Sequence, residues 1–246
     1  MRKQSGFGLT ELMIGMVVGL IIIAGVITVY MSIVKGSSDT LKSAKLNQEL
    51  SAAMAIMVQD IRRAGYWGAA EPDNLNNPFM VAGTSDLNIL DVSNTGDCIL
   101  YTYDLNSNGS SNNEFFGFKL ENGQIMMRTG NGTTTADCTD GTWLTVTDPK
   151  VITVNTLTFT TTNSKCLNSS STASPQANWK IDSATSTSFP CRDDTGTGYT
   201  APAAGNILVE SRQVMINLTG TLTSDNTVTK VLTDSVRVRN DRIFKK

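Results

Sequence analysis

Glu11 is the side chain whose position most needs a chemical explanation, because it opens a stretch without charged residues from Leu12 to Val34. A carboxylate deep in a membrane helix is unfavourable by about 2.5 to 3.5 kcal/mol. A cation about 4 Å away would gain about 4 kcal/mol at an effective dielectric constant of about 20, enough to offset that burial. We therefore expect Glu11 to have a positively charged partner. Taken alone, the residue also fits the cytoplasmic end of an ordinary membrane anchor.

The chain contains no histidine, which excludes several common kinds of catalytic and metal site. This absence removes the Ser-His-Asp and Cys-His arrangements, the usual zinc sites and the imidazole general base. Ser-Lys catalysis by an anchored enzyme is the alternative that remains, and no S-x-x-K motif is placed convincingly for it. The 20 basic and 22 acidic residues leave a net charge of -2, which gives no general attraction to nucleic acid. We predict a protein that is not an enzyme and that needs no metal or cofactor.

The stretch from Leu12 to Val34 has neither charge nor proline, and it is long enough to cross a bilayer, which takes about 20 helical residues. Arg2 and Lys3 precede it, so the positive-inside rule places the N-terminus in the cytoplasm and everything after Lys35 across the membrane. An ordinary secretory signal is cut after its apolar core. Here Gly6 lies before the core, and a cut there would leave the apolar helix at the start of the mature chain.

Four cysteines lie in the exported part of the chain, where an oxidising periplasm favours disulfides: Cys98, Cys138, Cys166 and Cys191. Four cysteines allow three pairings. We favour Cys98 with Cys138 and Cys166 with Cys191, because the second bridge would staple a segment rich in serine and threonine that has little apolar content. Each bridge would contribute about 2 to 4 kcal/mol. Buried free thiols are the alternative.

The polar stretch "DLNSNG" places Asp104, Asn106 and Asn108 at alternate positions, as at the start of a calcium-binding loop. The twelfth position, which needs a carboxylate, is Phe115, and Glu114 comes one residue early. We therefore prefer a polar hairpin loop to a metal site.

Basic residues gather in two stretches and could form a local surface for DNA or for a protein partner: Arg62, Arg63, Arg237, Arg239, Arg242, Lys245 and Lys246. Solvated side chains, or side chains paired with acidic neighbours, are the alternative. Aromatic residues are not interleaved with them as in single-strand binders. Direct binding of nucleic acid is therefore not expected.

Apolar residues recur at steps of three and four from Leu41 to Ile61, which predicts a helix with one buried stripe: Leu46, Leu50, Met54, Met57 or Val58, and Ile61. We expect this helix to continue from the membrane segment, with a bend at Gly36 to Asp39. Gly65 is the predicted C-terminal stop.

The rest of the chain reads as β-strands separated by polar turns. Runs at Cys98 to Tyr103, Phe115 to Leu120 and Gln124 to Arg128 are typical of strands, and Asn122-Gly123 predicts a hairpin between the last two. Further apolar residues alternate with polar ones: Leu157 and Phe159; Val214, Ile216 and Leu218; Val236 and Val238. The predicted fold class is α+β, with a long N-terminal helix, first membrane-spanning and then amphipathic, packed on an antiparallel β-sheet domain.

The stretch "GFGLTELMIGMVVGL", from Gly6 to Leu20, resembles the type IV prepilin signature: a short basic leader ending in glycine, then phenylalanine, and glutamate as the fifth mature residue. The resemblance implies that prepilin peptidase cuts between Gly6 and Phe7 and methylates the new amine of Phe7. It also implies that Glu11 docks the subunit by pairing with the N-terminal amine of a neighbouring subunit. That amine would be the cation that Glu11 requires.

Two further stretches, "DIRRAGYWG" (Asp60 to Gly68) and "SVRVRND" (Ser235 to Asp241), are similar to the PilW family of minor pilins, which is related to the J-type pseudopilin of type II secretion. The resemblance implies a pilin fold. Residues 1–6 would be the leader, 7–35 the transmembrane and filament-core helix, 36–65 an amphipathic helix, and 66–246 a periplasmic β-rich head. Residues 163–200 look like a variable insertion in that head.

A minor pilin of this family implies membership of a tip complex that starts pilus assembly, for twitching motility, adhesion or DNA uptake. The expected partners are other minor pilins, the major pilin, prepilin peptidase and the bacterial inner membrane. The head would lie in the periplasm and later on the pilus, at its tip. The alternative is a J-like minor pseudopilin of a type II secretion system, which would share the processing site and the fold.

Overall fold

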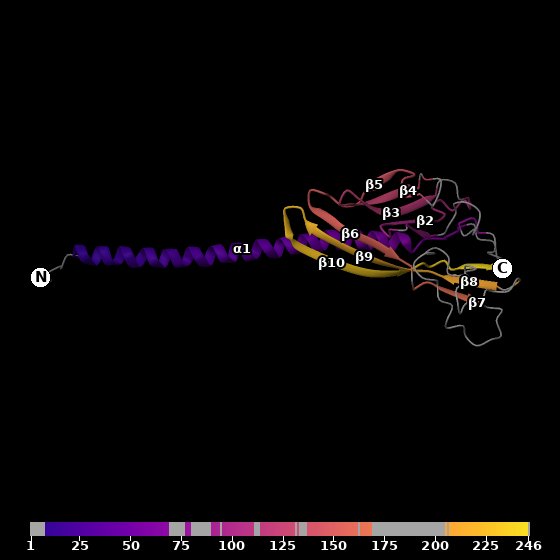
Figure 1. Ribbon diagram of the computed structural model, residues 1–246. Helices are drawn as coiled ribbons and strands as arrows, with labels where there is room; N and C mark the ends of the chain where they lie inside the picture. Colours follow the sequence, from indigo (N-terminus) through magenta and orange to yellow (C-terminus); the bar gives the residue numbers. More distant parts are fainter. Residues whose placement is uncertain are drawn as a thin grey trace. The chain divides into compact units, whose positions relative to one another are not determined.

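A computed structural model defines residues 8–68, 77–79, 90–93, 95–110, 114–130, 132, 137–161, 163–168, 205 and 207–245. The chain divides into two units, Met1–Lys45 and Leu46–Lys246, and each is described by itself. Helix α1 (Leu9–Ile61) contributes residues to both units, and the strands all belong to the second unit (Figure 1).

In the first unit, the apolar side chains of α1 are covered by none of the unit's described residues. Its large apolar side chains from Leu9 to Val34 are all exposed. The helix is long and apolar enough to cross a membrane. Residues 36–39, where the sequence predicts a bend, are helical, and Thr40 Oγ1 donates to the Gly36 carbonyl at 2.9 Å. The helix therefore continues through this segment without a break.

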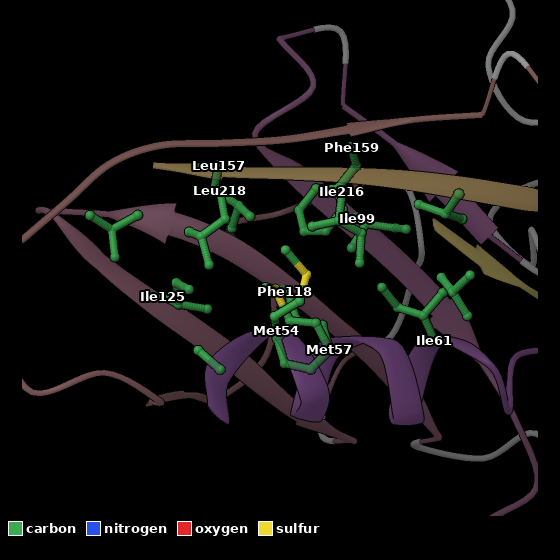
Figure 2. Close-up of a cluster of buried hydrophobic side chains, with 14 of the residues drawn as sticks. Met54, Met57, Ile61, Ile99, Phe118, Ile125, Leu157, Phe159, Ile216 and Leu218 are labelled. Atoms are coloured by element: carbon green, nitrogen blue, oxygen red, sulfur yellow. The ribbon is translucent and has the colours of Figure 1, made fainter. Parts of the chain in front are cut away.

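In the second unit, the remaining turns of α1 bury one stripe of side chains: Leu46, Leu50, Ala53, Met54, Met57 and Ile61. Between the two alternatives for one position, Met57 is fully buried and Val58 only partly. Figure 2 shows Met54 and Met57 pointing from the helix toward Phe118. The predicted amphipathic stripe is confirmed.

The helix ends at Ile61 in a tight turn that closes on Gly65. Ala64 donates its N–H to the Ile61 carbonyl at 3.1 Å. Gly65 has a φ of 72°, a conformation that glycine adopts readily, and its N–H donates to the carbonyl of Thr102 at 2.8 Å. The predicted stop is confirmed, and the same glycine joins the helix end to strand β2 (Cys98–Thr102).

The first sheet is antiparallel, with neighbouring strands in chain order: β1 (Leu90–Val92), β2, β3 (Phe115–Glu121), β4 (Gln124–Gly130) and β5 (Trp143–Thr145). Asn122 and Gly123 join β3 to β4 with φ values of 51° and 74°. Positive φ at both central residues is what a two-residue turn of type I′ requires. The predicted hairpin is confirmed, with Glu121 paired to Gln124.

The other strands form two antiparallel sheets. One has the order β10 (Asp225–Arg237), β9 (Gln213–Leu222) and β6 (Ile152–Thr160); the other has the order β11 (Arg242–Lys245), β8 (Ile207–Ser211) and β7 (Lys165–Asn168). Every second residue of β9 from Val214 to Leu222 is buried. Gly220 in β9 leaves room for the helix, because a Cβ there would lie 2.9 Å from Leu50 Cδ2.

One hydrophobic core connects the helical stripe to the first two sheets. Phe118 comes from the first sheet, and Phe159 and Ile216 come from the second (Figure 2). All three are buried in one cluster with Leu50 and Met57. The predicted β-sheet domain is thus built from three sheets in the described residues. One long N-terminal helix followed by antiparallel sheets is an α+β layout consistent with the pilin fold that the resemblance implies.

A disulfide joins Cys98, at the start of β2, to Cys138, with the two Cα atoms 6.5 Å apart. This confirms the first of the two favoured pairings. Lys119 Nζ donates to the Cys138 carbonyl at 3.3 Å, so the same segment is also held to β3. The side chain of Cys166 and all of Cys191 lie outside the described residues, as does most of the predicted insertion.

Candidate functional site

The N-terminus of α1 is organised by Glu11. Gly8 caps the helix, because its carbonyl accepts the N–H groups of Glu11 and Leu12 at 3.1 and 3.3 Å. Glu11 Oε2 in turn accepts the N–H of Gly8 at 3.2 Å. This is one half of a capping box, and glycine lacks the side chain that would supply the other half. The carboxylate also lies at the positive end of the helix dipole, which favours its charge.

This geometry directs the Glu11 carboxylate back along the chain while leaving it exposed. Gly6 and Phe7 lie outside the described residues. Phe7 directly precedes Gly8 in the sequence. A cut between Gly6 and Phe7 would therefore create an amine one residue before the N–H group that Glu11 already accepts.

Asp60, near the C-terminal end of α1, is the centre of a polar cluster. Its carboxylate accepts the hydroxyl of Tyr101 at 2.6 Å and that of Tyr103 at 2.9 Å, and it forms an ion pair with Arg63 at 3.4 Å. The Arg63 guanidinium lies 4.2 Å from the centre of the Tyr103 ring, which stacks on Phe116 at 4.0 Å. Burial, and then the charge of Asp60, raises the pKa of both tyrosines well above the ordinary value. Both hydroxyls therefore stay protonated donors at neutral pH.

The segment after β10 is fastened to the same end of the helix. The N–H of Arg239 donates to the Arg62 carbonyl at 3.1 Å. The Asn240 side-chain amide donates to the carbonyls of Arg63 and Ala64 at 3.3 and 3.1 Å. Carbonyls in and just after the last turn of a helix have no partner within the helix itself. The stretches Asp60 to Gly68 and Ser235 to Asp241 therefore meet, although Asn240 and Arg63 are 177 residues apart.

Three arginines from these two stretches line one hollow of about 360 Å³, which we call the arginine pocket: Arg62, Arg237 and Arg239, with Val238. Arg237 forms an ion pair with Asp241 at 3.0 Å. Of the other predicted basic residues, Arg63 belongs to the Asp60 cluster, and Lys246 lies outside the described residues. Two more are in β11: Arg242 and Lys245. The structure thus brings together three of the predicted basic residues, and the side chains of Arg242 and Lys245 lie outside its description.

The candidate calcium loop uses its carboxylates to hold its own backbone. Asp104 accepts three backbone N–H groups at 3.0 to 3.1 Å: those of Gly68, Asn108 and Gly109. Glu114 Oε1 accepts two more, at 2.9 and 3.4 Å: those of Leu105 and Asn106. These bonds engage both carboxylate oxygens of the buried Asp104 and one of the buried Glu114, whose Oε2 has no hydrogen-bond partner among the described residues.

Comparison with known protein families gives two matches. The model described as prepilin peptidase-dependent protein B matches residues 39–238, and that of the prokaryotic N-terminal methylation motif matches residues 1–27. The chain belongs to the prepilin peptidase-dependent protein B family. No curated protein and no solved structure matches significantly.

Membership of the prepilin peptidase-dependent protein B family makes the chain type IV pilin-like, with a prepilin-type N-terminus. The methylation motif contains Gly6, Phe7 and Glu11, whose separate roles in cleavage, methylation and docking stay predictions. The apolar helix and this motif together fit a membrane-anchored pilin. The larger match contains the Asp60 cluster and ends at residue 238, within the arginine pocket.

Sequence reasoning missed the Asp60 cluster in this prepilin peptidase-dependent protein. Asp60 lies 41 and 43 residues from the two tyrosines that donate to it. One signal was available, because Tyr101 and Tyr103 are two residues apart, and such residues share one face of an extended chain. Two buried hydroxyls on one face need an acceptor. Nothing local identified Asp60 as that acceptor.

Proposed function

We propose that this chain is a non-enzymatic minor pilin of the PilW kind, which joins other minor pilins in a tip complex that starts assembly of a type IV pilus. Before assembly, its helix would cross the bacterial inner membrane with the N-terminus in the cytoplasm and the head in the periplasm. The observation that carries the proposal is an exposed carboxylate, Glu11, directly before the uncharged stretch from Leu12 to Val34, whose large apolar side chains are exposed in the described part of the first unit.

An uncovered apolar helix has two natural environments, lipid and a bundle of similar helices. Both environments cover the side chains from Leu12 to Val34, so apolar burial alone does not fix the register of this helix against its neighbours. A specific ion pair does fix that register. Among the described residues, Glu11 accepts the N–H of Gly8, and the amine of a neighbouring mature Phe7 would add a charge-assisted partner at one position only.

Mass analysis of the membrane-extracted protein tests the processing step. We expect the mature chain to lack residues 1–6 and to carry one methyl group on the amine of Phe7. A strain without prepilin peptidase is the control, and it should yield the uncut chain. A mature protein that keeps its initiator methionine in the presence of the peptidase would contradict the proposal.

Complementation of a deletion strain tests the docking role. Deletion should reduce surface piliation, and Glu11→Ala should fail to restore it because the helix loses its charged partner. Glu49→Ala is the matched control, since it removes a second carboxylate from α1, in the other unit, and should restore piliation. If the deletion strain has normal pili and loses type II secretion instead, the chain is a J-like pseudopilin and the minor pilin proposal is wrong.

A further inference from the structure

We propose that the arginine pocket docks an acidic segment of a partner subunit, with Arg62 and Arg239 binding its carboxylates. The inference rests on the proposed function in one respect: the partner is taken to be another subunit of the same filament. It describes a second contact between subunits, which the head makes through the arginine pocket, in addition to the contact proposed for Glu11.

The pocket is held in place by backbone contacts and by burial. Val236 and Val238 are buried at 0% and 1% exposure, whereas Arg237, at the end of β10, and Arg239, in the bend that follows, are exposed. The bond from Arg239 N–H to the Arg62 carbonyl fixes this segment beside the helix end. The main chain thus brings the three arginines to the lining of one hollow.

The charges of the pocket are not balanced by the described part of the chain. Arg237 is paired with Asp241, while the guanidinium groups of Arg62 and Arg239 make no hydrogen bond or ion pair with any described residue. The nearby Asp60 carboxylate is already engaged by two tyrosine hydroxyls and Arg63. The arginines are also not needed to cap the helix, because backbone and asparagine N–H groups reach its last carbonyls.

A carboxylate is the ligand that this arrangement favours. Guanidinium groups are planar and weakly hydrated, and they bind carboxylates through two parallel hydrogen bonds. Like charges gathered in one hollow repel one another, and an anion relieves that repulsion. Two unpaired guanidinium groups therefore favour a segment with more than one Asp or Glu side chain.

The same features disfavour nucleic acid as the occupant. Proteins that bind single-stranded nucleic acid combine a positively charged groove along the backbone with aromatic side chains on which bases stack, and duplex binding needs many phosphate contacts. The described lining of the pocket has no aromatic residue, and the whole chain has a net charge of -2. One compact hollow fits a few carboxylates of a protein better than an extended phosphate backbone.

The test measures binding of a fluorescent hexaglutamate peptide to the detergent-solubilised full-length chain by anisotropy. Arg62→Gln with Arg239→Gln should weaken binding at least about tenfold, because two charge-assisted contacts are lost. The matched control is Lys150→Gln with Lys230→Gln, which removes the same charge from exposed positions elsewhere on the head and should leave binding unchanged. Arg62→Lys with Arg239→Lys keeps the charge but not the bidentate geometry, and it should give an intermediate affinity.

Equal weakening in the Arg→Gln and control pairs would overturn the proposal, because the peptide would then sense only net charge. Binding of a hexathymidine oligonucleotide that depends on the pocket, without peptide binding, would overturn it in favour of nucleic acid. An unchanged thermal unfolding midpoint shows that the Arg→Gln pair is folded. In cells, the variant protein with both Arg→Gln substitutions should be cut and methylated normally, but the strain that carries it should assemble fewer pili. If the proposed function is wrong instead, the deletion strain will have normal pili while the purified chain still binds the peptide.

Discussion

The two parts of helix α1 bury apolar side chains by different means. In the first unit Ile21 is 66% exposed, whereas in the second unit Leu50 is 0% exposed. Both residues are aliphatic and helical, so the side chain itself does not explain the difference. What differs is the cover: the sheets of the second unit cover Leu50, whereas no described residue of the first unit covers Ile21, which is therefore available to a membrane or to other subunits.

The pattern of residues around the helix accounts for this difference. From Leu12 to Val34 the helix is apolar on every side, which is typical of a helix that is surrounded by lipid or by other helices. From Leu46 onward one apolar stripe is buried, and the exposed side carries polar residues such as Asn47 and Gln48 as well as Ile56, which is typical of a helix that lies on a folded domain. One part of this helix thus leaves its apolar side chains available for contacts outside the chain, and the other part packs in the core of the second unit.

The carboxylates at the two ends of α1 show the same contrast. Asp60 is satisfied within its own unit by two tyrosine hydroxyls and Arg63. Glu11 accepts one backbone N–H and stays exposed. The first carboxylate stabilises the head, and the second is available to a cation from outside the chain.

The largest effect on stability is expected from a change in the buried stripe. Leu50→Ala should lower the free energy of unfolding of the head by about 2 to 5 kcal/mol, because it opens a cavity against β9. Ile21→Ala is the matched control, and it should change that value by less than about 0.5 kcal/mol. Urea unfolding of the full chain in detergent, followed by near-UV circular dichroism, measures both. Equal losses in the two variants would contradict the comparison.

A slightly smaller effect is expected from the disulfide of the second unit. Replacing Cys98 and Cys138 by alanine should lower the free energy of unfolding by about 2 to 4 kcal/mol, because the unfolded chain gains freedom. Each single replacement breaks the same bond, so it should have nearly the full effect of the double replacement. Thermal unfolding of the three variants is the measurement, and additive losses would refute a shared bridge.

The smallest effect is a dependence of stability on alkaline pH. The pKa values of Tyr101 and Tyr103 are raised by folding, so their contribution is fully present below the unfolded pKa of about 10 and is lost as pH rises toward the folded values. The free energy of unfolding of the head should therefore fall above about pH 10.

Unfolding measured at increasing pH checks this expectation. Tyr101→Phe with Tyr103→Phe should remove much of the dependence. Tyr30→Phe, in the first unit, is the control and should keep it. A pH dependence that is unchanged in the double variant would show that the Asp60 cluster is not its origin.

Much of the second unit could be predicted because the signals are local. Leu46, Leu50 and Met54 follow one another at the spacing of a helix face, and Asn122-Gly123 prescribes a turn that needs positive φ at both residues. The division into three sheets could not be predicted, because a strand's own sequence does not say which distant strand it joins. Register between β6 and β9, for example, depends on residues about 60 positions apart, such as Thr158 and Asn217.

The sequence by itself determined the prepilin-type N-terminus and which turns of α1 are apolar on one side or on all sides. These properties depend on residues within a few positions of one another. Only the tertiary structure decided that Asp60 receives two tyrosines and that Asn240 meets the end of the helix, across 177 residues in the second case. The physical reason is that such contacts depend on how the strands are ordered and paired. The same order brings Arg62 and Arg239 to one pocket, which no local sequence pattern predicts.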